Sequence, residues 1–125
     1  MGTRLATCAC RQLKLSCTGD PTAVSLCHCL ECQRRTGSAF GIGAFFSRVN
    51  VEATGQTKAF TRSSDSGHSV TFHFCPNCGT TVFWEPGRRP DMIAVAVGAF
   101  AEPSFPRPTK SVYSEHRHPW IQFAN

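Results

Sequence analysis

The sequence has no hydrophobic run long enough to cross a membrane. Its most apolar stretch, Ile93–Val97, is far shorter than the roughly 20 residues that a transmembrane helix needs. The first ten residues also lack the apolar core of a secretory signal peptide. We therefore expect a cytoplasmic protein with no membrane partner, whose cysteine thiols stay reduced.

Helical periodicity and internal repeats are also missing from the sequence. Short segments that alternate apolar and polar side chains lie between turn residues, which is typical of an all-β protein. A chain of 125 residues suits a single domain, 1–125, because two smaller units would each bury too little apolar surface. The expected strands are residues 4–16 as a strand–turn–strand unit, Ala23–Leu26, Arg48–Ala53, Lys58–Arg62, Val70–Phe74, Val82–Trp84 and Met92–Gly98.

Charged residues are few, at 17% of the total, and Lys and Arg form no dense cluster. The formal charge of +5 counts every cysteine as neutral. A Zn²⁺ ion on four thiolates is a dianion and one on three thiolates is a monoanion, so two such sites would cancel more than half of that charge. The basic pairs Arg34–Arg35 and Arg88–Arg89 are too sparse for the basic face of a nucleic-acid-binding protein, and we expect no nucleic-acid partner.

Cysteine is the residue that the sequence has in excess, with eight in the chain. The segment Cys75–Gly79, CPNCG, has the spacing of a zinc knuckle, in which two thiols three residues apart bind one metal ion. The glycine permits the positive φ that this turn requires. Cys8 and Cys10 lie on one face of an extended segment. Reduced thiols at these spacings indicate metal binding rather than disulfides.

The two cysteine pairs together supply enough ligands for one closed metal site. We expect Cys8, Cys10, Cys75 and Cys78, the cysteine quartet, to bind a structural zinc ion in a tetrahedral site. This pairing closes a loop of more than about 60 residues, for which loop-closure entropy predicts a large stabilisation.

Three further thiols lie within six residues of one another. Cys27, Cys29 and Cys32, the cysteine trio, can bind one metal ion by themselves. Three protein ligands and an open fourth position form the catalytic type of zinc site. In the competing partition Cys17 or His28 closes this second site, and both zinc ions are then purely structural.

These motifs resemble the glutathione-dependent formaldehyde-activating enzyme (GFA) family, also called the centromere-protein-V-like family. The resemblance covers nearly the whole chain, and its motifs are Cys8-x-Cys10, Cys27-His28-Cys29-x-x-Cys32 with Thr36-Gly37-Ser38, Cys75-Pro76-x-Cys78-Gly79-Thr80 and Pro119-Trp120. It implies an all-β, Mss4-like fold with a structural zinc ion on the quartet and a more labile one on the trio. It also implies a carbon–sulfur lyase that forms S-hydroxymethylglutathione from glutathione and formaldehyde.

The enzyme hypothesis places the reaction at the trio. A metal ion lowers the pKa of a thiol that it binds, so the sulfur of glutathione would attack an aldehyde there. Arg34 and Arg35 follow the trio and are candidates for binding the carboxylates of glutathione. The alternative is a non-catalytic, zinc-scaffolded binding module. An open metal position facing a cavity near these arginines favours the enzyme, whereas four protein ligands favour the module.

The histidines are weaker candidates. For His28, between two cysteines of the trio, we favour a packing or surface role over proton transfer. His73 alternates with phenylalanines, which indicates a structural role, and His116 with His118 is a candidate third metal patch. No cysteine follows Cys78, which excludes a methionine sulfoxide reductase because that chemistry needs a C-terminal nucleophilic cysteine.

Overall fold

The computed structural model describes residues 2–64 and 66–123, which form mainly β-strands. The strands are β1 Thr3–Thr7, β2 Lys14–Thr18, β3 Ala23–Cys27, β4 Gly41–Ser47, β5 Val51–Thr54, β6 Lys58–Ser63, β7 Ser69–Phe74, β8 Thr81–Pro86, β9 Met92–Ala96 and β10 Lys110–Val112. A small sheet has the strand order β1-β2-β5, and a large sheet has the order β10-β3-β4-β9-β8-β7-β6. The two sheets confirm the predicted all-β fold.

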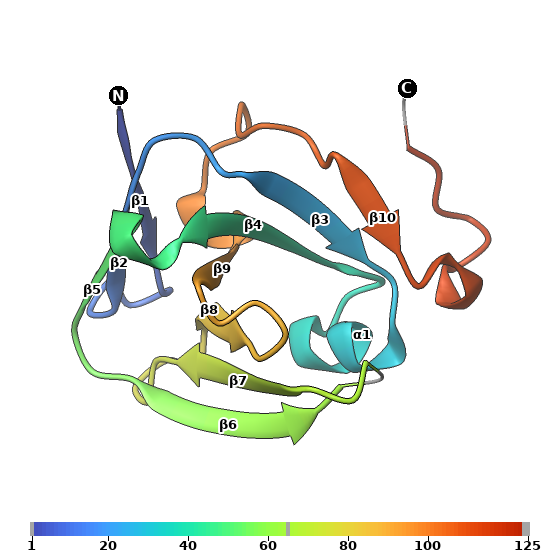
Figure 1. Cartoon of the computed structure of the whole chain (residues 1–125), viewed down its shortest axis with the longest axis horizontal. Helices are drawn as coiled ribbons and strands as arrows, with labels where there is room; N and C mark the ends of the chain where they lie inside the picture. The colour runs from blue at the N-terminus through green and yellow to red at the C-terminus, as the bar shows by residue number, and fades with distance from the viewer. Residues whose placement is uncertain (1, 65, 124–125) are drawn as a thin grey trace.

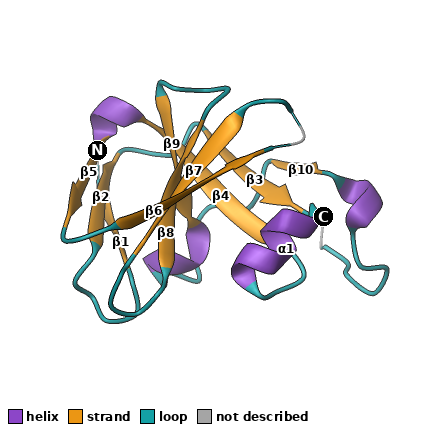
Figure 2. Cartoon of the chain, turned by 90° about the horizontal axis from the view of Figure 1, so that it is seen from below, coloured by secondary structure: helices purple, strands orange, loops and turns teal. Residues whose placement is uncertain are grey.

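The large sheet curves around the α-helix α1, Leu30–Thr36. In Figure 1, β10, β3 and β4 form one side of the curved sheet, and β7 and β6 form the other side. β9 and β8 connect the two sides, and α1 lies between them. Figure 2 shows α1 near the ends of β3 and β4. Neighbouring strands of this sheet are antiparallel except for β10 and β3, which are parallel.

The two faces of the large sheet have different roles. Side chains alternate along β4, so Ala44 and Phe46 point into the hydrophobic core while Phe45 lies on the opposite face. The core lies between the large and small sheets, and its fully or almost fully buried members include Ala6, Leu13, Leu15, Cys17, Val24, Phe46, Val82 and Val95. The opposite face, where Phe45, Phe72 and Trp84 lie, is left for α1 and the cavities beside it.

The structure differs from the sequence-based strands in three segments. The strand expected at Met92–Gly98 ends at Ala96, because Val97–Phe100 forms a 3₁₀ turn. Arg48–Asn50 forms a 3₁₀ turn, so the strand expected at Arg48–Ala53 is wrong in its first half. The side chain of Val49 is 89% exposed, and no buried face therefore supports extended pairing there. β10 is a strand that alternation does not predict, because its three residues are too few to show a pattern. No described helix is long and apolar enough to cross a membrane.

The turn after β5 provides a test of the fold. Gly55 has a φ of +101°, and a Cβ atom there would clash with the backbone oxygen of Gln12, whereas Gly67 (φ +84°) has open space at the same position. We expect Gly55→Ala to reduce the free energy of unfolding by at least about 2 kcal/mol more than Gly67→Ala, which carries only the cost of its left-handed backbone. Urea unfolding at fixed metal content measures both values, and equal losses would contradict the contact.

Candidate functional site

The cysteine quartet assembles where two hairpins meet. Cys8 and Cys10 lie in the turn after β1, and Cys75 and Cys78 lie in the turn between β7 and β8. The four Sγ atoms lie within 4.8 Å of one another. The Sγ atom of Cys10 is 3.7 Å from that of Cys8 and 3.7 Å from that of Cys75. The fold thus brings together the two pairs that the sequence separates.

The geometry of the quartet fits a tetrahedral zinc ion and not disulfides. A disulfide has an S–S distance of about 2.05 Å, whereas Zn–S bonds of about 2.3 Å place the sulfurs of a tetrahedral site about 3.8 Å apart. The backbone N–H groups of Asn77 and Cys78 donate to Cys75 Sγ at 3.3 and 3.4 Å, as thiolate ligands require. Hydrogen bonds from Thr80 lower the pKa of Cys78 to about 5.

The cysteine trio surrounds the start of α1. Cys27 ends β3, Cys29 caps the helix, and its Sγ accepts a hydrogen bond from the Cys32 backbone N–H at 3.3 Å. Hydrogen bonding with the Cys27 thiol and the nearby charge of Arg35 lower the pKa of Cys32 to about 5. The three Sγ atoms lie within 4.8 Å of one another, and no other His, Cys, Asp or Glu of residues 2–64 and 66–123 completes this group. A tetrahedral metal ion here would keep one position for a ligand from outside the protein.

A cavity of about 260 Å³ opens onto the trio. Its walls beyond the cysteines include Arg34 of α1, Arg62 of β6, Ser64, Tyr113 and His116. The parallel pairing of β10 with β3 sets Val112 opposite Cys27, and this brings the C-terminal segment to the metal-binding loop. Sequence reasoning does not find Tyr113, because its place in the site depends on a short strand that pairs over a long distance.

The two arginines next to the trio have different surroundings. Arg34 is exposed and forms an ion pair with Glu31 at 3.2 Å. The guanidinium of Arg35 lies over the ring of Trp84, with Cζ 4.4 Å from the ring centroid, and its Nε is buried without a hydrogen-bond partner among the described residues. Successive helical residues point about 100° apart. Arg34 therefore lines the trio's cavity and Arg35 does not. Both arginines line a cavity of about 490 Å³, and Arg35 also lines two cavities that Arg34 does not reach.

Arg62 is a candidate that the sequence analysis missed. It lines the trio's cavity and two adjoining cavities, and its Cζ lies 5.2 Å from the centroid of the Phe72 ring. Phe60 of β6 pairs directly with Phe72 of β7, so Arg62, two residues further along, lies on the same face of the sheet. This alternation is the signal that could have identified Arg62.

The two residues considered for closing the second site lie elsewhere. Cys17 is fully buried in the hydrophobic core, where burial raises the pKa of its thiol to about 11. His28 is also fully buried, and its Nε2 lies 3.1 Å from the hydroxyl oxygen of Ser111. Burial, followed by the charge of Arg117, lowers the pKa of His28. Neither residue belongs to a cysteine group in the described part of the chain.

Two of the other histidines make hydrogen bonds away from the cysteines. His73 bonds to Glu85 at 2.6 Å between β7 and β8, and His118 bonds to Gln33 at 2.8 Å. His116 lines the trio's cavity. Among residues 2–64 and 66–123, His116 and His118 form no third metal-binding group.

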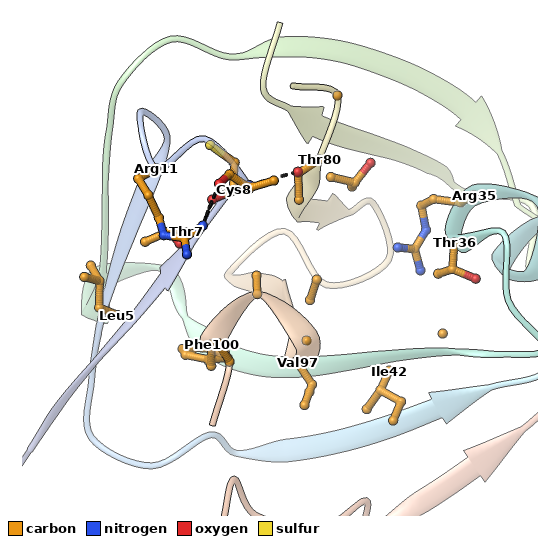
Figure 3. Close-up of a pocket in the computed structure, with 18 of the residues that line it drawn as sticks. Leu5, Thr7, Cys8, Arg11, Arg35, Thr36, Ile42, Thr80, Val97 and Phe100 are labelled. Atoms are coloured by element: carbon orange, nitrogen blue, oxygen red, sulfur yellow. Dashed lines mark hydrogen bonds between the residues drawn. The ribbon is translucent and has the colours of Figure 1, made fainter. Parts of the chain in front are cut away.

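A larger cavity, of about 820 Å³, adjoins the quartet rather than the trio. Figure 3 shows Arg35 and Thr36 on one side of it and Arg11, Cys8 and Thr80 on the other. Four thiolates fill the tetrahedral shell of a zinc ion, so no free metal position faces this space. We therefore place the candidate functional site at the smaller cavity, where the trio lies.

Comparison with known proteins agrees with these motifs. A family model described as glutathione-dependent formaldehyde-activating enzyme, GFA, matches residues 3–116. The chain belongs to the GFA family. The crystal structure of a Rhodobacter sphaeroides protein resembles the structure of this GFA family member, with a TM-score of 0.58 and a sequence identity of 18%. The match covers 76% of this chain and 85% of the other chain. At this identity the likeness supports the fold alone. The search of curated proteins gave no match.

The two cysteine groups should respond differently to loss of one thiol. We expect Cys75→Ser to unfold or strongly destabilise this GFA family member, because a structural metal ion contributes free energy to folding. Cys32→Ser should remain folded and bind about one zinc ion per chain instead of about two. Metal analysis and thermal unfolding measure both effects, with Cys17→Ala as the control that keeps both ions. Equal damage from the two serine variants would show that the groups do not have separate roles.

Proposed function

We propose that this protein is a zinc-dependent, carbon–sulfur lyase-like enzyme that joins the thiol of glutathione to an aldehyde, as in the formation of S-hydroxymethylglutathione from formaldehyde. The observation that supports this most is the cysteine trio, which has three donors and borders a cavity. The match to the GFA family model supports the same class of substrates.

The two cysteine groups suggest separate roles for two zinc ions. Cys8, Cys10, Cys75 and Cys78 would hold the structural ion, and the trio would hold the second. When bound to the trio, a zinc ion supplies Lewis acidity and lowers the pKa of a thiol at its free position. The cavity walls then have to bind glutathione, orient the aldehyde and move one proton.

The reaction requires one bond to form and one proton to move. The sulfur of glutathione attacks the carbonyl carbon, so a C–S bond forms and the π electrons of the C=O bond move to the oxygen. The oxygen takes up the proton that the thiol releases, and no oxidant or reductant is needed. Tyr113 and His116 line the cavity and have exchangeable protons, so we assign this transfer to them.

Binding of glutathione requires positive partners for its carboxylates. Arg34 and Arg35, which both line the adjoining cavity of about 490 Å³, are our candidates, and Arg34 also lines the trio's cavity. The ion pair between Arg34 and Glu31 is exposed, with side-chain exposures of 70% and 51%. Such pairs contribute little free energy, so Arg34 can exchange its partner for a substrate carboxylate.

The competing proposal is a non-catalytic binding module in which zinc is only a scaffold. A scaffold site has four protein ligands, whereas the trio has three among the described residues. The cavity in front of the trio also has a mixed lining of charged and proton-exchanging groups. Both observations favour the enzyme.

The proposed reaction can be followed by NMR exchange spectroscopy between formaldehyde hydrate and S-hydroxymethylglutathione. We expect the zinc-loaded protein to raise the exchange rate above the spontaneous one in proportion to its concentration. Cys32→Ser should reduce this increment at least tenfold, because it removes a ligand of the second metal ion, and Cys17→Ala should retain it. An increment that Cys32→Ser leaves intact, or no increment at all, would favour the binding module.

The role of Arg34 gives a separate prediction. We expect Arg34→Gln to raise the KM for glutathione about three- to tenfold and to leave kcat nearly unchanged, because an exposed arginine contributes to ground-state binding. Arg88→Gln, at an exposed loop position, is the matched control. A lower kcat with an unchanged KM would contradict a binding role.

A further inference from the structure

Behind the trio lies a smaller cavity that formaldehyde would not fill. Its volume is about 160 Å³, and Cys27 and Cys32 of the trio form part of its wall. Its lining includes four apolar or aromatic side chains: Phe45, Val70, Phe72 and Trp84. The cavity thus lies directly against the proposed reaction centre.

Strand register aligns the aromatic side chains of this cavity, which lie on β4, β7 and β8. Phe72 of β7 pairs with Trp84 of β8, Trp84 with Ala94 of β9, and Ala94 with Phe45 of β4, so these residues form a row across one face of the large sheet. Gly43 lies under Trp84, since a Cβ atom there would come within 2.7 Å of the Trp84 ring. The small residues beside the aromatic ones leave room between the sheet and α1.

The size of the cavity indicates what it can hold. An apolar cavity of about 150 Å³ in a protein is large enough to bind benzene, and this one measures about 160 Å³. Formaldehyde has no side group, so its adduct with a thiol would leave the space unfilled. A six-membered aromatic ring on the aldehyde carbon would fill it and stack among the aromatic side chains.

The charged side chains around this cavity indicate which substituent an aromatic ligand should carry. Arg62 borders this cavity, the trio's cavity and a third one of about 490 Å³. Its NH1 donates to the adjacent Ser63 carbonyl at 3.2 Å, and no carboxylate within the described residues forms an ion pair with it. Arg35, on the same wall, has a buried Nε without a hydrogen-bond partner. The wall is therefore cationic and suits a carboxylate.

We propose that the cavity behind the trio is a specificity site for a small aromatic aldehyde that bears a carboxylate. The ring occupies the space beside Trp84, the carboxylate binds Arg62, and the aldehyde carbon faces the trio. This inference rests on the proposed function for the chemistry at the trio, and it replaces formaldehyde by a larger carbonyl compound as the preferred substrate.

Binding of benzoate, an unreactive aromatic carboxylate, tests the inference without turnover. The chain has two tryptophans, and Trp120→Phe leaves Trp84 as the fluorescent probe inside the cavity. We expect benzoate to change Trp84 fluorescence with a Kd at least tenfold lower than that of acetate. Arg62→Gln should weaken benzoate at least tenfold but change the Kd of neutral benzyl alcohol less than twofold. Arg88→Gln should alter neither, and Val70→Phe, which fills the cavity, should abolish both.

Each contrary result has a distinct meaning. Equal affinities for acetate and benzoate would show that the ring contributes nothing to binding and would overturn the ring site. Benzoate binding unchanged by Arg62→Gln would overturn the carboxylate assignment, and no response to benzoate by fluorescence or calorimetry would overturn the inference as a whole. The same titration in Cys32→Ser should still show benzoate binding. If the zinc-loaded protein without this substitution binds benzoate but does not catalyse exchange between glutathione and formaldehyde, the proposed function fails and the ring site stands.

Discussion

The junction of the two cysteine pairs is the contact on which the rest of the structure depends. Cys10 and Cys75 are 65 positions apart, and their union closes a loop that contains β2 to β7. Closing so long a loop removes a large amount of conformational entropy from the unfolded chain. Gln12 strengthens the junction, because its Nε2 donates at 2.9 Å both to Cys75 Sγ and to the carbonyl of Gln56. The small sheet, the turn after β5 and the β7–β8 hairpin are thereby held together.

That junction leaves one face of the large sheet free for function. The face toward the small sheet is mostly filled by buried apolar side chains, and the cavity of about 820 Å³ at its edge borders the quartet rather than the trio. The face toward α1 carries large rings next to small residues, with Trp84 over Gly43 and Arg35 over Trp84. The curvature of the sheet brings β6 close to the start of α1, and this places Arg62 at the trio although the two lie 30 or more residues apart in the sequence.

Local spacing predicts the cysteine groups well, and it fails where geometry depends on distant pairing. The turn Cys75–Gly79 and the cluster at Cys27–Cys32 are recognisable because each group folds within a few residues. Arg34 and Arg35 look equivalent in the sequence, but on the helix only Arg34 lines the trio's cavity and only Arg35 lies over the ring of Trp84. Arg62 and Tyr113 are brought to the trio by strand pairings across the large sheet. Neither strand contains a motif that predicts its pairing partner, so the walls of the site can be identified only from the structure.

The walls of the cavities therefore come from more of the chain than the metal ligands do. All three sulfurs of the trio belong to one six-residue segment, so their arrangement needs only β3 and the first turn of α1. The walls include residues of β3 and α1, among them Arg34 and Arg35, but they also come from β4, β6, β7, β8, β10 and the segment after β10. A substitution on β6 or β7 can alter the shape or charge of the cavity without moving a metal ligand. The fold thus permits a change of substrate at a constant metal site, and the row of aromatic residues beside the trio is where such a change would act.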